Sequence, residues 1–277
     1  DEAIYIFDKF VIKFLFDESW VQEKVQRANI LLPLVPEIEG VKKNFFRYKY
    51  VEGDVYSRAV TPTDFEKFLN WCRSNLWVTI KEVSTKQFQD VCHDFYFNKT
   101  IQRIKKIMDL YSIKDKEDII NEEKIPPVMS LINKIDFNWL TKAKQNKIHG
   151  DLILENIIRT PSGHKLLDWR QNFGGLLKAG DMYYDLAKLN HNLTVNHDII
   201  DQNLFIIEDK GNSIVCDIFR KENLVECQKV LFNFINKEKL DSEKVRILTA
   251  LVWLNMSPLH HHPFNLFLYY FGKLNLW

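Results

Sequence analysis

The sequence has few cysteines, no marked charge excess and no long apolar run. Its four cysteines form no CxxC pair and are too sparse for a disulfide framework, which favours a reducing, cytoplasmic setting. A formal net charge of +1 gives no reason to expect binding to nucleic acid or to an anionic membrane surface. No apolar segment reaches the length of a membrane span. With 46% hydrophobic and 27% charged residues, the composition is that of an ordinary soluble globular protein.

The two ends of the sequence carry separate expectations. The C-terminal stretch PFNLFLYYFGKLNLW is apolar but short, and Lys273 interrupts it. We expect a buried terminal helix there, with membrane contact or a partner groove as minor alternatives. At the other end there is neither a Met nor a signal peptide, and apolar residues already alternate from Ala3. We therefore expect the natural protein to begin upstream of Asp1.

The first 53 residues predict a small β-rich region. AIYIFDKFVIKFLFD is rich in Ile, Val, Phe and Tyr, which indicates a hairpin with strands at 3–7 and 10–16. Asp17 can cap a helix whose apolar residues recur at helical spacing until Pro33. A further strand is expected at 45–51, rich in aromatic residues.

From about Thr61 the pattern becomes mainly helical. The segment KIHGDLILENIIRTPSGHKLLDW, residues 147–169, breaks this pattern, because two short apolar runs flank the turn TPSG as in a hairpin. From Asp181 onward helices are expected to dominate again, with one turn at DKGNS. We therefore predict an α+β protein with two lobes, a β-rich one at 1–53 and a larger helical one at 54–277.

The polar residues of this central segment match what phosphoryl transfer from ATP requires. The triphosphate needs a cation, Mg²⁺ needs oxygen ligands, and the acceptor hydroxyl needs a base. FVIKF places Lys13 on a strand, HGDLILEN places Asp151 five residues before Asn156, and LLDW places Asp168 after an apolar run. Each residue alone is compatible with an ordinary turn or a solvent-facing strand. Their combination follows the order of the corresponding groups in protein kinases.

HGDLILEN, LLDW and GDMYYDLA together resemble the aminoglycoside phosphotransferase and choline kinase superfamily. The resemblance is strongest over Ile148–Leu189 and follows nearly the whole chain in order. It implies small-molecule kinases with a two-lobed protein-kinase-like fold, a catalytic loop at 148–156 and a metal-binding hairpin at 164–169. LLDWRQNFGGLLKAGDMYYDLAKL and SPLHHHPFN are more loosely similar to kinase-like proteins from bacterial surface-polysaccharide gene clusters.

The resemblance implies a role for each matching residue of the catalytic segment. Asp151 is the base that orients the acceptor hydroxyl. Asn156 and Asp168 are Mg²⁺ ligands. His149 braces the loop and Asp185 caps it from a helix.

It also implies where the nucleotide binds. Lys13 contacts the α- and β-phosphates, and an acidic residue of the next helix pairs with it, for which Glu23 is the first choice and Glu18 the second. Backbone groups near Tyr50 and Val51 form the hinge that meets adenine.

Two departures from the family pattern are visible. Members often carry an acidic residue after the D-W pair, where this chain has Arg170, which is expected to contact a phosphate or an acidic acceptor. No Gly-rich phosphate loop is present. In this fold it precedes the strand that starts at Ala3, so it would lie upstream of Asp1.

The run of three histidines allows several interpretations. His260, His261 and His262 could line the acceptor pocket, form a structural loop before Pro263, or bind a metal. Three adjacent histidines cannot all point at one ion from a regular element, and neither cysteine nor an acidic cluster lies beside them. The first two alternatives are therefore favoured.

We therefore expect an ATP- and Mg²⁺-dependent kinase acting on a hydroxyl of a sugar or an amino alcohol, in line with a role in surface-polysaccharide synthesis. Gly180 follows Asp168 by only twelve residues, which leaves no long activation segment and favours a small acceptor over a protein. The alternatives are a pseudokinase that only binds nucleotide and an enzyme that transfers AMP. The oligomeric state stays open.

Overall fold

The computed structural model describes residues 2–277 and groups the chain into two compact units. The first comprises Asp1–Ser84 and Lys144–Asp185, and the second Thr85–Ala143 and Leu186–Trp277. The chain crosses between the units after Ser84, after Ala143 and within helix α8 (Met182–Thr194). A β-sheet near the N-terminus and a helical remainder confirm the predicted α+β class.

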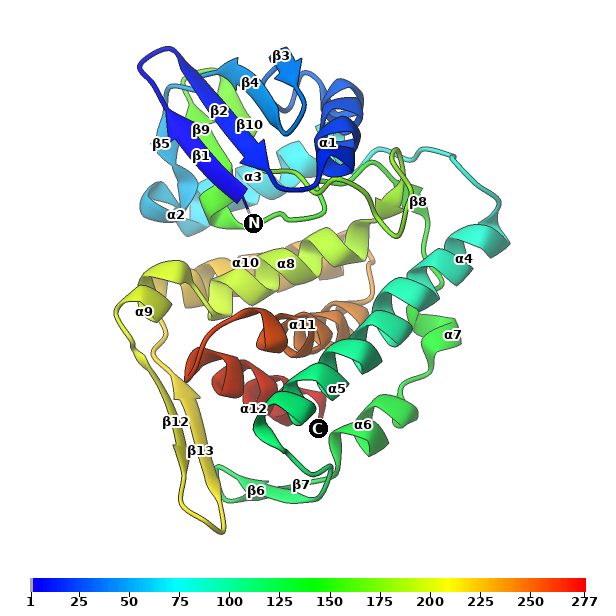
Figure 1. The fold of residues 1–277 in the computed structure, drawn as a ribbon, viewed down its shortest axis with the longest axis vertical. Coiled ribbons are helices and arrows are strands. Elements are labelled where there is room, and N and C mark those ends of the chain that lie inside the picture. The colour runs from blue at the N-terminus through cyan, green and yellow to red at the C-terminus, as the bar shows by residue number, and fades with distance from the viewer. Residues whose placement is uncertain (1) are drawn as a thin grey trace. The chain divides into compact units, whose positions relative to one another are not determined.

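A four-stranded antiparallel sheet opens the first unit (Figure 1). Its order is β1-β2-β4-β3, with bounds β1 (Glu2–Ile6), β2 (Phe10–Leu15), β3 (Ile38–Lys42) and β4 (Phe45–Lys49). Buried and less buried residues alternate along β2, because successive side chains of a strand point to opposite faces. This alternation places Lys13 on the buried face with Val11 and Leu15. The predicted hairpin is confirmed, and the strand expected at 45–51 ends two residues earlier.

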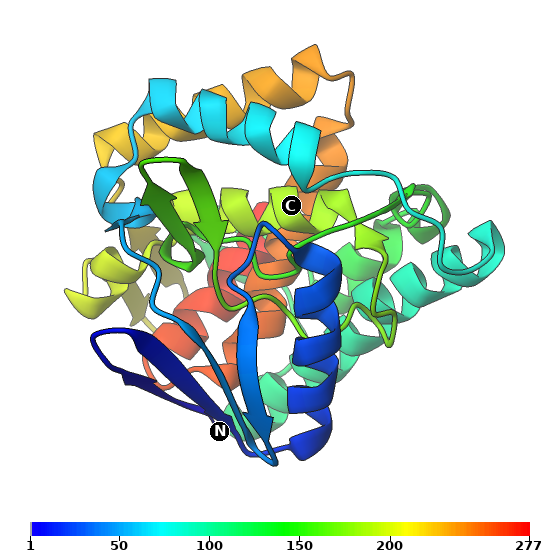
Figure 2. The same cartoon turned by 90° about the horizontal axis from the view of Figure 1, so that it is seen from above.

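Helix α1 (Glu18–Leu31) follows the hairpin and packs against β2 and β4 (Figure 2). Asp17 caps it by accepting a hydrogen bond from the N–H of Ser19 at 2.9 Å, as the sequence predicts. Its buried residues recur every three or four positions, which is the period of one helix face. They are Val21, Lys24, Arg27, Ala28 and Leu31. Two cations thus lie on the inward face of this helix.

A second sheet holds the central hairpin. Its order is β10-β9-β5, with bounds β5 (Asp54–Val55), β9 (Ile157–Thr160) and β10 (Gly163–Leu166). The hairpin β9–β10 closes at the predicted TPSG turn. Pairing of β9 with β5 groups this hairpin with the N-terminal residues, while the division into lobes after residue 53 stays a prediction. The unit also contains α2 (Tyr56–Ala59), α3 (Pro62–Asn75), β8 (Gln145–Asn146), the 3₁₀ turn η2 (Leu154–Asn156) and β11 (Gly180–Asp181).

The second unit is mainly helical. Its N-terminal part contains α4 (Thr85–His93), the π-helical turn η1 (Asp94–Asn98), α5 (Lys99–Tyr111), β6 (Asp118–Ile120), β7 (Glu123–Ile125), α6 (Val128–Lys134) and α7 (Phe137–Leu140). Its C-terminal part contains α9 (His197–Asp201), β12 (Phe205–Asp209), β13 (Ile214–Ile218), α10 (Glu222–Lys237), α11 (Ser242–Met256), η3 (Ser257–Leu259) and α12 (Phe264–Leu276). Helices α11 and α12 pack closely at Gly272, where a Cβ would lie 2.8 Å from Cγ of Leu254. The expected buried C-terminal helix is confirmed.

Two hairpins lie in this unit, where the sequence predicts mainly helices and one turn at DKGNS. Strands β12 and β13 flank the DKGNS turn, and they join β6 and β7 in a sheet of order β12-β13-β6-β7 (Figure 1). The side chain of Asn121 donates to the carbonyl of Cys216 at 2.7 Å and accepts from its N–H at 2.9 Å. This partner lies far away in sequence, so the local pattern did not reveal that either segment forms a sheet.

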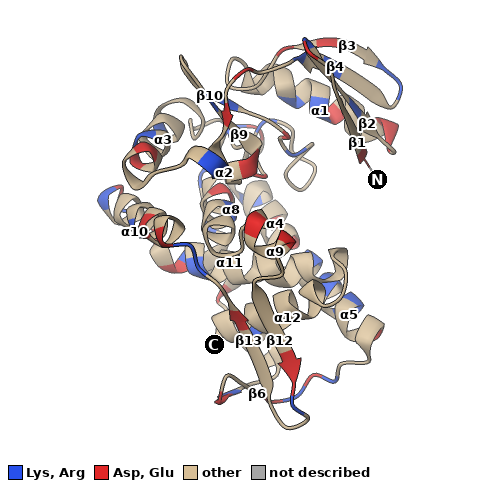
Figure 3. Cartoon of the chain, turned by 90° about the vertical axis from the view of Figure 1, so that its left-hand side faces the viewer, with Lys and Arg blue, Asp and Glu red and all other residues tan. Residues whose placement is uncertain are grey.

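Charges of both signs are interspersed on the helices. Figure 3 shows Lys and Arg mixed with Asp and Glu along α3 and α10. Among the described helices, none is long and apolar enough to cross a membrane.

A buried ion pair connects α12 to β6 and generates a stability prediction. The ammonium of Lys273, which is fully buried, lies 2.6 Å from the carboxylate of Asp118 and donates to the carbonyl of Lys116 at 2.8 Å. Replacing Lys273 with Met leaves the carboxylate without its partner. We expect the free energy of unfolding in urea to fall by about 3–5 kcal/mol.

The double variant Lys273→Met/Asp118→Leu is the control, because it removes the unpaired charge. It should recover part of the loss. A single variant as stable as the wild type would contradict this account of the pair.

Candidate active site

The hairpin β9–β10 returns the chain to the end of the predicted catalytic loop. The N–H of Leu167 donates to the carbonyl of Asn156 at 2.7 Å. Asp168 is the next residue, so backbone pairing brings the two predicted metal ligands to the same place. The turn η2, which ends at Asn156, supplies the compact geometry that this return requires.

The side chain of Asn156 closes the loop onto Asp151. Its Nδ2 donates to the carbonyl of Asp151 at 2.9 Å. The spacing of five residues therefore has a structural reason, since the amide spans the loop. With Nδ2 engaged, Oδ1 is the atom of this side chain suited to a hard cation.

His149 is a neutral brace inside the loop. The ring is fully buried, and burial lowers the pKa of His149 to about 4. Nδ1 accepts from the N–H of Asp151 at 3.2 Å, so Nε2 carries the proton and donates to the carbonyl of Leu167 at 2.8 Å. One imidazole thus holds the loop and the segment before Asp168, which matches the role expected for it.

Gly150 is the residue that the loop geometry demands. Its φ is +84°, in the left-handed region, and a Cβ at this position would lie 2.7 Å from Cβ of Arg170. Its N–H donates to Oδ1 of Asp185 at 2.7 Å. A larger residue here would push Arg170 away and strain the backbone.

Asp185 caps the loop from the first turn of α8. Its fully buried carboxylate also accepts from the N–H of His149 at 2.9 Å and from Nε1 of Trp77 at 3.1 Å. Burial raises the pKa of Asp185 to about 6, and these hydrogen bonds act against that rise. The contacts correspond to the capping role implied by the sequence.

Arg27 is a positioning residue that the sequence did not reveal. From the inward face of α1, its guanidinium donates to the carbonyl of Ile148 at 2.6 Å and to that of Leu177 at 3.0 Å. Burial lowers the pKa of Arg27 to about 10, so it stays charged at neutral pH. The sequence offered one sign that Arg27 is buried, namely its position on the apolar face of a predicted helix.

Two lysines converge on Asp168. The ammonium groups of Lys13 and Lys24 lie 2.6 and 2.7 Å from the same carboxylate oxygen, and both lysines are buried. Burial alone would raise the pKa of Asp168, but Lys24 and Lys13 hold it well below its usual range. Asp168 also has a φ of +55°, an uncommon conformation that the surrounding contacts stabilise.

The predicted pairing of Lys13 with Glu23 is wrong in this structure. Glu23 instead accepts from Nδ2 of Asn172 at 2.7 Å, and Glu18, the second choice, is exposed. The reason is the direction in which successive side chains of a helix point. Lys24 lies on the inward face of α1, whereas Glu23, one residue earlier, points toward the loop around Asn172. Besides Asp168, the partner of Lys13 is Glu2, at 3.9 Å.

Trp169 connects α1 to the site. Its indole is buried, and Nε1 donates to the backbone carbonyl of Lys24 at 2.8 Å. Its ring lies 6.3 Å from that of Phe46 in β4. The tryptophan of the D-W pair thus fixes the helix whose lysine reaches the neighbouring Asp168.

Tyr50, Val51 and Arg170 are the remaining predicted residues of the first unit. Tyr50 and Val51 follow β4, and the N–H of Tyr50 donates to the carbonyl of Lys9 at 3.0 Å. Their part in a nucleotide site stays a prediction. Arg170 places its N–H against the carbonyl of His149 at 3.1 Å, within the loop structure.

The three histidines belong to the second unit. His260, His261 and His262 line a pocket of about 370 Å³ together with His191 and His197. Within residues 2–277, no group of three or more His, Cys, Asp or Glu side chains is arranged to hold a metal ion. A role of this run in the acceptor site stays a prediction.

The donor set of Asn156 and Asp168 fits Mg²⁺. One amide oxygen and one carboxylate are hard ligands, and Mg²⁺ is commonly bound by one or two protein groups together with substrate phosphates. The low pKa of Asp168 keeps that carboxylate ionised and able to bind a cation.

His149 gives a pH-dependent prediction. Its pKa falls from 6.5 to about 4 on folding, so the unfolded chain binds a proton in this window that the folded chain does not. Stability from this residue is therefore lost as the pH is lowered, by about 2 kcal/mol between pH 7 and pH 5. His149→Gln removes this dependence.

Urea unfolding of both proteins at the two pH values measures the effect. The stability advantage of the wild type over His149→Gln should shrink by about 2 kcal/mol at pH 5. Asp185 has the opposite dependence, because its pKa is raised, but it is present in both proteins. An advantage that is constant with pH would contradict the neutral, buried state of His149.

Comparisons with known proteins establish the fold. No protein-family model matches the sequence, and no curated protein matches it. Among solved structures, a putative fructosamine-3-kinase from Thermobifida fusca is similar with a TM-score of 0.58 and 12% identity, covering 100% of this chain and 92% of that one. The GDP complex of aminoglycoside 2'-phosphotransferase-IIIa has a TM-score of 0.56 and 12% identity, covering 100% and 90%. The streptomycin–ATP complex of APH(2")-IIa has a TM-score of 0.55 and 14% identity, covering 100% and 87%. The chain therefore has the protein-kinase-like fold of these phosphotransferases.

Proposed function

We propose that this protein is an ATP- and Mg²⁺-dependent kinase that phosphorylates a hydroxyl group of a small polar molecule. The observation that carries the proposal is the convergence of Asp151, Asn156 and Asp168 through the contacts of one loop and one hairpin, with Lys13 paired to Asp168. These are the side-chain types that phosphoryl transfer requires.

Asp151 acts as the base in this proposal. Its backbone is held at the N–H by His149 and at the carbonyl by Asn156, which fixes the position of its carboxylate. The carboxylate accepts the proton of the acceptor hydroxyl as that oxygen bonds to the γ-phosphorus. The bond from the γ-phosphorus to the bridging oxygen breaks, and ADP leaves with that electron pair.

Asn156 and Asp168 would hold Mg²⁺, which neutralises phosphate charge when it is bound. Lys13 and Lys24 supply two further buried cations beside Asp168. In the free chain they compensate the carboxylate, and with nucleotide bound their charge is available to the phosphates. Arg170 stands where an acidic residue is expected in the family.

The acceptor class rests on the fold neighbours and on the sequence. Structures of a putative fructosamine-3-kinase and of a streptomycin–ATP complex share the fold, and both names describe phosphoryl transfer to, or binding of, small hydroxyl-bearing molecules. We propose a sugar or amino alcohol as acceptor, as a building block of a surface polysaccharide, on the strength of the looser sequence similarity.

The cysteines support a reducing compartment. All four described cysteines are free and buried, Cys72, Cys92, Cys216 and Cys227. We propose the cytoplasm, where disulfides are rare and ATP is supplied.

Replacing Asp151 with Asn tests the base. We expect kcat for ADP release, measured with a panel of sugars and amino alcohols, to fall roughly 10²–10⁴-fold while ATP binding is nearly unchanged, because only the proton acceptor is lost. Glu155→Gln makes the same chemical change in the same loop and should keep activity. Normal turnover by Asp151→Asn would refute the assigned mechanism.

Thermal unfolding with ATP, with Mg²⁺ and with both tests the metal ligands. A ligand that binds only the folded state raises the Tm by mass action. We expect the largest rise with both present, and Asp168→Asn should abolish the part that depends on Mg²⁺. Asp54→Asn, which alters an exposed ion pair with Arg159, is the control.

The outcomes separate the alternatives. A rise in Tm without ADP release for any acceptor would favour a pseudokinase. A product heavier by AMP would favour nucleotidyl transfer. Absence of any rise would refute a nucleotide site at Lys13 and Asp168.

A further inference from the structure

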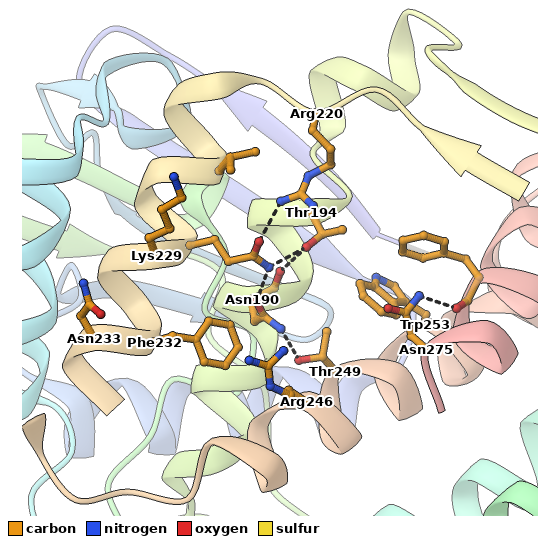
Figure 4. Close-up of a pocket in the computed structure, with 13 residues that line it drawn as sticks. Asn190, Thr194, Arg220, Lys229, Phe232, Asn233, Arg246, Thr249, Trp253 and Asn275 are labelled. Atoms are coloured by element: carbon orange, nitrogen blue, oxygen red, sulfur yellow. Dashed lines mark hydrogen bonds between the residues drawn. The ribbon is translucent and has the colours of Figure 1, made fainter. Parts of the chain in front are cut away.

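The second unit contains a pocket that none of the proposed kinase residues lines. Its volume is about 570 Å³, and side chains of α8, α10, α11 and α12 surround it (Figure 4). Every lining residue lies within the second unit. A cavity of this size can hold a small molecule.

The lining is cationic. It includes Arg220, Lys229 and Arg246, and no carboxylate. Lys229 pairs with Glu226 outside the pocket, but within residues 2–277 neither arginine has an acidic partner. Arg246 instead lies over the ring of Phe232, 4.4 Å from its centroid. Positive charge without compensation favours an anionic ligand.

A chain of hydrogen bonds orders the polar wall. A guanidinium N–H of Arg220 donates to Oε1 of Gln228 at 3.0 Å. Nε2 of Gln228 donates to Oδ1 of Asn190 at 2.7 Å, and Nδ2 of Asn190 donates to Oγ1 of Thr249 at 3.0 Å. Figure 4 shows Arg220, Asn190 and Thr249 along this series. The wall is preformed, so a ligand would not have to order it.

Two buried donors at this pocket lack an acceptor. They are Nε of Arg220 and Nε1 of Trp253, an indole that is only 4% exposed. Both groups can donate but not accept, and a buried donor left without a partner is costly. Figure 4 places Arg220 and Trp253 around the same pocket. The chain provides donors here and leaves the acceptor to a second molecule.

We propose that this pocket binds a small organic anion. Its carboxylate or phosphate oxygens accept hydrogen bonds from Arg220 and Trp253, and its apolar body packs against Phe232 and Phe271. Burial lowers the pKa of Arg220, and an anionic partner would offset this loss of hydration.

Calorimetric titration of the full chain with three probes tests the ligand class. Benzoate, phenyl phosphate and benzyl alcohol present the same ring with a carboxylate, a phosphate or no charge. We expect saturable binding of at least one anion, with benzyl alcohol at least roughly tenfold weaker. The tighter of the two anions identifies the headgroup. Equal binding of benzyl alcohol, or binding of neither anion, would overturn the proposal.

Two substitutions assign the binding to this pocket. Arg220→Gln should weaken the preferred anion at least roughly tenfold, whereas Lys237→Gln, the same charge change on an exposed residue of α10 outside the lining, should not. Trp253→Phe keeps an aromatic ring but removes the unpaired donor. We expect it to weaken the anion, because one of the two unpaired donors is lost. Wild-type affinity in both pocket variants would overturn the assignment.

Lys13→Met separates this site from the proposed nucleotide site. This variant should bind the anion like the wild type, whatever it does to ATP. Loss of anion binding in Lys13→Met would place the anion in the first unit and would overturn the inference without touching the proposed function.

Discussion

The fully buried carboxylate of Asp185 determines the geometry of the predicted catalytic loop. It accepts hydrogen bonds from two consecutive backbone N–H groups, those of His149 and Gly150, and from the indole of Trp77. A carboxylate without these donors would be too costly to bury. The helix and the loop therefore require each other: the loop N–H groups compensate the buried acid, and the acid fixes the loop. His149 in turn accepts a hydrogen bond from the N–H of Asp151 and so holds that residue in place.

Two buried ammonium groups neutralise the carboxylate of Asp168 in the free chain and leave an excess of positive charge beside it. Lys13 and Lys24 share one oxygen of this carboxylate. In the proposed site, the phosphates of ATP and a divalent cation enter together, so the ammonium groups can turn to phosphate oxygens while the carboxylate turns to the cation. Such pairing matters because an uncompensated buried charge costs several kcal/mol.

The sequence predicted those parts of the candidate site that depend on short spacing along the chain. It did not predict those that depend on tertiary packing. The interval from Asp151 to Asn156 is set by one hydrogen bond within the loop, and the hairpin turn is local, so the motif predicted both. The partner of Lys13 depends on which side of α1 faces inward. The inward position is occupied by Lys24 and not by the adjacent Glu23, so α1 presents a positive charge there instead of a negative one. Arg27 and the sheets at residues 118–125 and 205–218 likewise depend on distant partners.

The pairing of buried hydrogen-bond donors differs between the loop around His149 and the pocket at Arg220. In the loop, a backbone N–H and an imidazole donate to acceptors supplied by the chain, as at Asp185 and Leu167. In the helical unit, Nε of Arg220 and Nε1 of Trp253 meet none. Since folding rarely leaves a buried donor unpaired without compensation, the first arrangement explains how a site is held rigid and the second indicates where a molecule from outside completes the structure.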